Sequence, residues 1–112
     1  MSSPSPDGVS KLNDDDYPAY TIGRAADLLD VQPAFLRSLD SSGMLSPERS
    51  AGGQRRYSRT ELALADRVRA LLDQNMPLAA AIRIVDLEEE LARAYRRIAS
   101  LQNPDGQPDP VP

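Results

Sequence analysis

The sequence predicts a mainly α-helical fold, in which two short helices and a β-hairpin precede two longer helices. Apolar residues recur at helical spacing in four segments of the 112-residue chain. A glycine pair at residues 52–53 separates the second segment from the third, and Gly-Gly favours a hairpin turn. The ends, residues 1–16 and 102–112, are rich in Ser, Pro, Asp and Gly and offer little apolar surface to bury, so we expect both to be disordered.

The first two helices are short and lie close together in the sequence. Within residues 20–31, Thr21 is in position to act as N-cap, and Asp30-Val31 breaks the apolar pattern. Residues 32–43 predict a second helix, because Pro33 suits a first helical position and Gly43 suits a helix end. The inward-facing candidates are Ile22, Ala25, Ala26 and Leu29 in the first helix and Leu36 and Leu39 in the second.

A hairpin is expected across residues 44–58. Pro47 and the glycine pair exclude a helix there. Strand alternation then places Arg55 and Tyr57 on one face and Arg56 on the other.

The third helix begins at Ser58, which forms a capping box with Glu61 three residues later. A fourth helix is expected from Leu78. Its apolar residues recur at alternating three- and four-residue steps, which is the seam pattern of a coiled coil: Ile84, Leu87, Leu91, Ala94, Ile98 and Leu101. A terminal helix that packs back on its own domain is the alternative to a dimerisation helix.

Composition narrows the possible functions. The chain has neither Cys nor His, which removes thiolate and imidazole chemistry and most transition-metal sites. It also lacks the Lys-Ser/Thr of a phosphate-binding loop. We therefore expect no enzyme, no metal and no cofactor. No apolar run approaches a membrane span, so the expected location is the cytoplasm.

The charge distribution is uneven along the chain. The net charge is −4, but residues 33–85 hold eight Arg against five acidic residues, and the acidity lies toward the two ends. A basic middle segment is compatible with a phosphate-bearing partner, whereas the total charge alone argues mildly against one.

The predicted order of elements is that of a winged helix-turn-helix domain, residues 17–84, followed by a dimerisation helix, residues 85–101. Residues 20–91 also resemble the DNA-binding region of MerR-family transcription regulators. The matching motifs are Thr21-Ile22-Gly23, Leu36-Arg37 followed by Asp40, Gly43-Met44-Leu45 followed by Pro47, Gly53-x-Arg55-Arg56-Tyr57-Ser58, and the "MPLAAAIRIV" stretch. The "AGGQRRYS" wing and the "DLEEEL" helix look most like the heat-shock repressor (HspR) branch of that family.

The resemblance implies sequence-specific binding to double-stranded DNA. Arg37 matches the arginine of the family's recognition helix, and its alternative is a surface ion pair with Asp40 or Asp73. Arg55 and Tyr57 match the wing arginine and aromatic, although Tyr57 can equally pack in the core. The residues expected to contact DNA are Gln32, Ala34, Arg37, Ser38, Arg55, Arg56 and Tyr57.

The resemblance also implies partners and a mode of action. A homodimer is expected, held by Leu87, Leu91, Ala94 and Ile98 and bound to a promoter or operator in the nucleoid. The protein would be a repressor without its own ligand-sensing domain, with a chaperone or RNA polymerase as a further partner. Two other functions stay open: a protein-binding adaptor that uses the Ile84–Leu101 stripe, and an excisionase-like DNA-architectural factor.

Overall fold

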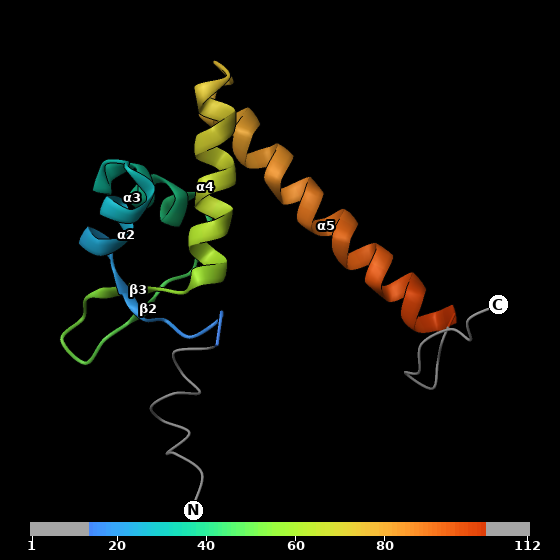
Figure 1. Cartoon of the computed structure of the whole chain (residues 1–112), viewed down its shortest axis with the longest axis horizontal. Coiled ribbons are helices and arrows are strands. Elements are labelled where there is room, and N and C mark those ends of the chain that lie inside the picture. The colour runs from blue at the N-terminus through green and yellow to red at the C-terminus, as the bar shows by residue number, and fades with distance from the viewer. Residues whose placement is uncertain (1–13, 103–112) are drawn as a thin grey trace, which may run out of the picture.

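The computed structural model describes residues 14–102. Seven elements follow one another: β1 (Tyr20–Thr21), α2 (Ile22–Leu29), α3 (Pro33–Ser42), β2 (Glu48–Arg49), β3 (Arg55–Tyr57), α4 (Arg59–Asp73) and α5 (Leu78–Gln102). The helices α2 and α3 lie to one side of α4, the strands lie at the base of α4, and α5 diverges from it on the other side (Figure 1). This is the mainly helical arrangement that the sequence predicts, with a small wing sheet and a long C-terminal helix.

Local signals define the three shorter helices as expected. The Thr21 side chain accepts a hydrogen bond from the Arg24 amide at the start of α2, and Asp30 ends that helix in the left-handed conformation. Pro33 opens α3 and Gly43, with φ of 86°, closes it. At the start of α4, the reciprocal hydrogen bonds between Ser58 and Glu61 form the predicted capping box.

The wing sheet has three strands rather than the two of a hairpin. The strand order is β1-β3-β2 and both pairs are antiparallel. Tyr20 pairs with Tyr57, and Arg49 pairs with Arg55. The hairpin tip uses one glycine for its conformational freedom, since Gly53 has φ of 82°. The added strand β1 ties the start of α2 to the wing.

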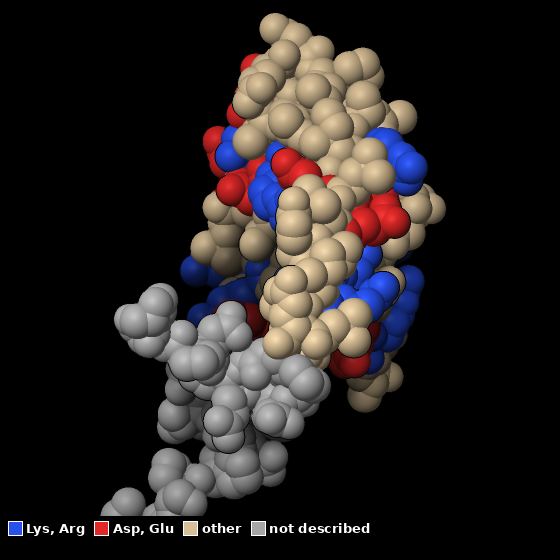
Figure 2. Space-filling view, turned by 90° about the vertical axis from the view of Figure 1, so that its right-hand side faces the viewer, with Lys and Arg blue, Asp and Glu red and all other residues tan. Residues whose placement is uncertain are grey.

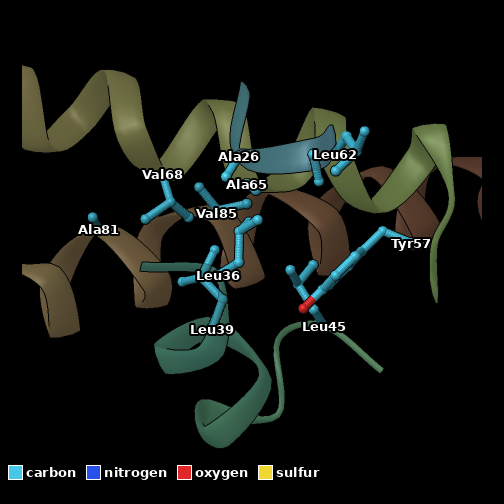
Figure 3. Packing of buried hydrophobic residues seen from close by; sticks show 11 residues of the cluster. Ala26, Leu36, Leu39, Leu45, Tyr57, Leu62, Ala65, Val68, Ala81 and Val85 are labelled. Atoms are coloured by element: carbon cyan, nitrogen blue, oxygen red, sulfur yellow. The ribbon is translucent and has the colours of Figure 1, made fainter. Parts of the chain in front are cut away.

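One hydrophobic cluster joins α2, α3, the wing and α4 to the start of α5 (Figure 3). Leu36 and Leu39 point from α3 into it, as predicted, and both are fully buried. Tyr57 enters from β3, and Ala81 and Val85 enter from α5. The exposed side of α3 is therefore fixed by the burial of its opposite side.

The N-terminal boundary predicted from composition is wrong at residues 14–16. Asp14–Asp16 form a turn against the start of α4, where the Asp15 carbonyl accepts from the Thr60 amide at 3.0 Å. Asp15 also forms an ion pair with Arg59 at 3.0 Å, and the Thr60 hydroxyl donates to Asp16 at 2.8 Å. Carboxylates beside a helix N-terminus are stabilised by its dipole, so these residues belong to the folded part. The expected disorder of residues 1–13 lies outside the described residues.

The C-terminal helix is continuous across the expected division at residues 84 and 85. It extends to Gln102, one residue into the segment expected to be disordered, and residues 103–112 lie outside the described range. Within residues 14–102, no helix is both long enough and apolar enough to cross a membrane.

Candidate nucleic-acid interface

The helix α3 presents one face to solvent. Gln32 is its N-cap residue, and Gln32, Ala34 and Arg37 are all exposed. Ser38 is half-buried, and its hydroxyl donates to the Phe35 carbonyl at 2.5 Å. These four predicted residues therefore lie together at the exposed N-terminal half of α3. Ser41 shares this face, four residues after Arg37, and the sequence reasoning missed it although the spacing indicates it.

Arg37 is exposed and makes no ion pair with any residue in the range 14–102. The two carboxylates considered as its partners are engaged elsewhere. Asp40 pairs with Arg55, and Asp73 pairs with Arg69 at 2.6 Å. The alternative role of Arg37, a surface ion pair with either residue, is therefore absent from the structure, and its guanidinium remains available to a ligand.

The wing places a second arginine beside Arg55. Arg49 lies opposite Arg55 in the β2–β3 register, and its Nη1 donates to the Gly53 carbonyl at 2.9 Å. Arg49 and Arg55 line one hollow together with Thr21, Ile22, Gly53 and Gln54. The hollow thus lies between the start of α2 and the tip of the wing. Arg49 is not among the DNA contacts predicted from the sequence, where the only signal for it is its position across the hairpin from Arg55.

Tyr57 serves the core and the wing rather than the surface. Its side chain is fully buried, and its hydroxyl donates to Asp40 Oδ2 at 2.7 Å. Burial first, and then the hydrogen bond and charge of Asp40, raise the pKa of Tyr57 well above its usual value, so the hydroxyl stays protonated as a donor. The expected phosphate contact of this residue is therefore corrected: the structure shows the core-packing alternative.

Arg55 and Arg56 point to different sides of the wing, as strand alternation predicts. Arg55 Nε lies 2.9 Å from Asp40 Oδ2, on the side of α3. Arg56 is half-buried in another hollow, whose lining includes Asp14, Asp16 and Glu48. Arg49 lines this hollow as well as the one beside Arg55, so Arg56 differs from Arg49 in lying only on the side of the wing away from Arg55.

The outer part of α5 carries an apolar face that the rest of residues 14–102 leaves uncovered. The exposed large apolar residues there are Leu87, Leu91, Tyr95, Ile98 and Leu101, and Ala94 is half-buried. Viewed from the side on which α5 lies, the molecule has an uncharged stretch down its middle with charged side chains on either side (Figure 2). The fold-back alternative is wrong, because α5 diverges from the domain (Figure 1). Tyr95 was missed, although it lies four residues after Leu91.

Two ion pairs form a brace between α4 and α5. Arg67 on α4 lies 2.6 Å from Glu88 and 2.6 Å from Glu89 on α5. These hydrogen bonds raise the pKa of Arg67 above its ordinary value. Beyond the brace, α5 projects away from the domain. Within residues 14–102, no cluster of three or more acidic, His or Cys side chains is arranged to hold a metal ion.

Comparison with known proteins identifies relatives of this fold. A heat-shock relative from Streptomyces coelicolor, which carries the name HspR, is 40% identical over 88 residues; the match covers 78% of this chain and 58% of that protein's length. Two crystal structures share the fold at lower identity. One is HiNmlR, a MerR family regulator lacking the sensor domain and bound to promoter DNA, with a TM-score of 0.54 and 22% identity over 75% of this chain and 76% of that one. The other is a MerR family transcriptional regulator from Bacillus cereus, with a TM-score of 0.53 and 21% identity over 75% of each chain.

The family model decides the assignment. It describes the MerR HTH family of regulatory proteins and matches residues 20–88, which is more than half of the chain. The matched segment runs from β1 through the brace on α5 and so contains both the exposed face of α3 and the wing. The chain therefore belongs to the MerR helix-turn-helix family, whose members are DNA-binding transcription regulators and not enzymes.

Proposed function

We propose that this protein binds promoter DNA as a dimer and represses transcription by occupying the site. The observation that carries the proposal is the uncovered face of α3, with an exposed Arg37 that has no ion pair in residues 14–102, next to a wing hollow lined by Arg49 and Arg55. A helix with one exposed face and a basic hairpin beside it is the geometry with which winged helix-turn-helix proteins bind the major groove and the flanking backbone.

The proposed contacts follow from exposure. Gln32, Ala34, Arg37 and Ser38 meet base edges and phosphates in the major groove, because they share the exposed face of α3. Arg49 and Arg55 bind phosphates from the wing. Arg56 and Tyr57 are left out of the contact set, since Arg56 lies on the side of the wing away from Arg55 and Tyr57 is buried.

The relatives support DNA binding, and the proposed repression rests on the resemblance of the wing sequence. HiNmlR is a MerR family regulator bound to promoter DNA, and its fold matches this one. The relative named HspR is a heat-shock protein, and the wing of this chain resembles the heat-shock repressor branch. The match covers 58% of the length of the relative named HspR, so the support from that relative applies to the matched part.

The dimer is proposed from the apolar face of α5. Its charges are segregated: residues 86–90 include Asp86 and Glu90, and residues 91–102 include Arg93, Arg96 and Arg97, none of which has an ion pair within residues 14–102. An antiparallel pair of α5 helices would set each acidic half beside a basic half, whereas a parallel pair would set like charges together. Such a two-fold dimer presents two copies of α3 to a pseudo-palindromic site.

A protein-binding adaptor remains the second candidate, because the same apolar face of α5 is uncovered in the described chain. The two functions differ in what they require of α3. An adaptor that binds through α5 has no need of Arg37, whereas the proposed regulator does.

Arg37→Ala is expected to lower the affinity for a specific duplex by about five- to a hundredfold, which corresponds to the loss of one arginine contact to a base edge or phosphate. The duplex is recovered by selection from a random library with the full chain, and binding is measured by fluorescence anisotropy at two salt concentrations. If Arg37 contacts phosphate, the variant also shows a shallower salt dependence than the wild type.

Arg83→Ala is the matched control, since Arg83 is exposed on α5 and the substitution removes the same charge from another surface. Its affinity should stay within about twofold of the wild type, as expected of a charge that touches no phosphate. Equal losses in the two variants, or equal binding of the selected and scrambled duplexes, would count against the proposed interface and in favour of the adaptor.

A further inference from the structure

Asp40 lies where the recognition helix meets the wing. It comes from α3, and its side chain is 11% exposed. Two groups from β3 converge on its Oδ2 atom: Arg55 Nε, in an ion pair at 2.9 Å, and the Tyr57 hydroxyl, which donates a hydrogen bond at 2.7 Å. Its other oxygen, Oδ1, is buried and has no hydrogen-bond partner. One carboxylate thus connects α3 to two residues of the wing strand.

This arrangement is costly for the folded state. A buried carboxylate loses hydration, and an unpaired buried oxygen adds to that cost. Within residues 14–102, a single guanidinium, itself 29% exposed, supplies the only opposite charge in contact. Stability alone does not explain why a half-satisfied carboxylate occupies this position, since apolar residues often replace buried ion pairs without loss.

The contact with Asp40 determines which N–H groups of Arg55 remain available to a ligand. Its Nε lies 2.9 Å from Asp40 Oδ2 in an ion pair, and none of its N–H groups forms a hydrogen bond within residues 14–102. Arg55 also lines the hollow that contains Arg49, Thr21 and Ile22. A guanidinium is a planar fork with donors on more than one edge. Anchoring one edge to Asp40 leaves the other donors for a ligand in that hollow.

We propose that Asp40 is a positioning residue for DNA binding: from the recognition helix it holds Arg55 by Nε, so that the free Nη atoms face a backbone phosphate. The inference rests on the proposed function and deepens it. It links the two halves of the interface, because the side chain that orients the wing arginine belongs to the helix in the major groove. Rigid placement reduces the ordering cost of the phosphate contact.

The sign of the effect makes the proposal testable. Removing a carboxylate from a surface near DNA ordinarily strengthens binding, because it removes repulsion of the phosphates. If Asp40 only sequestered Arg55, its neutralisation would also release the arginine and strengthen binding. The positioning role predicts the opposite result for Asp40→Asn.

The experiment is a double-mutant cycle on the selected duplex with the full chain. Asp40→Asn should bind about five- to twentyfold more weakly than the wild type, as expected when an ion pair that orients a ligand group is lost. In the Arg55→Ala background the same substitution should no longer weaken binding. Asp27→Asn, which neutralises an exposed carboxylate on α2, is the charge control and should bind as tightly as the wild type or more tightly.

A second pair of variants separates positioning from folding. Tyr57→Phe removes the hydrogen bond to Asp40 but keeps the Arg55 ion pair, so it should lower thermal stability and leave affinity within about twofold, because the phosphate contact is untouched. Arg55→Lys keeps the charge but lacks the fork, so it should lose most of what Arg55→Ala loses. This variant also tests the proposal if Asp40→Asn does not fold.

Three results would overturn the inference. They are tighter binding by Asp40→Asn, an equal loss with and without Arg55, and full binding by Arg55→Lys. Failure of the proposed function is distinct from these, since it would show as no preference of the wild type for the selected duplex and no effect of Arg37→Ala.

Discussion

Replacing Leu91 and Ile98 together by Glu is expected to convert the protein to a monomer and to weaken binding of a two-half-site duplex by about a hundredfold or more. Leu91 is 55% exposed and Ile98 is 49% exposed on the apolar face of α5. In an α5–α5 dimer both side chains are buried, and charged groups there would lose hydration without a partner. A monomer also loses the avidity that two linked half-sites supply.

The measurement is analytical ultracentrifugation together with anisotropy on the same samples. Gln74→Glu with Ala80→Glu is the matched control, because it changes the net charge by the same amount at two exposed positions outside the apolar face of α5. The control should remain dimeric. A wild-type protein that is monomeric at concentrations where it binds DNA would contradict the dimer.

Leu36→Ala is expected to lower the free energy of unfolding by about 2–5 kcal/mol, the usual cost of removing a fully buried leucine side chain and leaving a cavity. Leu36 has no exposed surface and lies in the cluster that joins α2, α3 and α4. Domains of this size have only about 5–15 kcal/mol of total stability. The variant should therefore lose a large fraction of its stability, and its DNA binding should fail at a lower temperature than that of the wild type.

Urea denaturation followed by circular dichroism measures this effect. Leu28→Ala is the control, since Leu28 lies on α2 and is 50% exposed; its expected cost is below about 1 kcal/mol, because little apolar area is uncovered. Similar costs for Leu28→Ala and Leu36→Ala would mean that the cluster in Figure 3 does not form the core.

Local chemistry made the helices predictable. The residues that start and end α3, Pro33 and Gly43, act within a few bonds of their own backbone, and so do Ser58 and Glu61 at the start of α4. Such effects depend little on tertiary contacts, so the sequence alone indicates them. The alternation of Arg55 and Arg56 across β3 was predictable for the same reason.

Features that depend on distant residues were not predictable. The strand β1 is two residues long and exists because Tyr20 meets Tyr57 across 37 positions of chain. The turn at Asp14–Asp16 is ordered by α4, which composition does not reveal. The role of Tyr57 was left open by the sequence, since a wing aromatic can face DNA or the core. In the structure its ring lies in the core, and its hydroxyl donates a hydrogen bond to Asp40.

The heptad pattern of α5 left two structures possible, because a seam of apolar residues can cover its own domain or a second helix. Its direction depends on the contacts of Val85 and on the brace from Arg67 to Glu88 and Glu89. The brace pairs residues more than twenty positions apart, so the spacing of residues within α5 does not indicate it.

The measurement to make first is an NMR titration of the isotope-labelled full chain with the selected duplex. DNA binding through α3 and the wing predicts that the backbone amides of residues 32–38 and 49–55 shift or broaden most, while those of Asp86 to Glu90 change little. If instead the changes are confined to residues 87–101, with α3 and the wing unaffected, the proposed DNA interface is wrong and α5 is the binding surface.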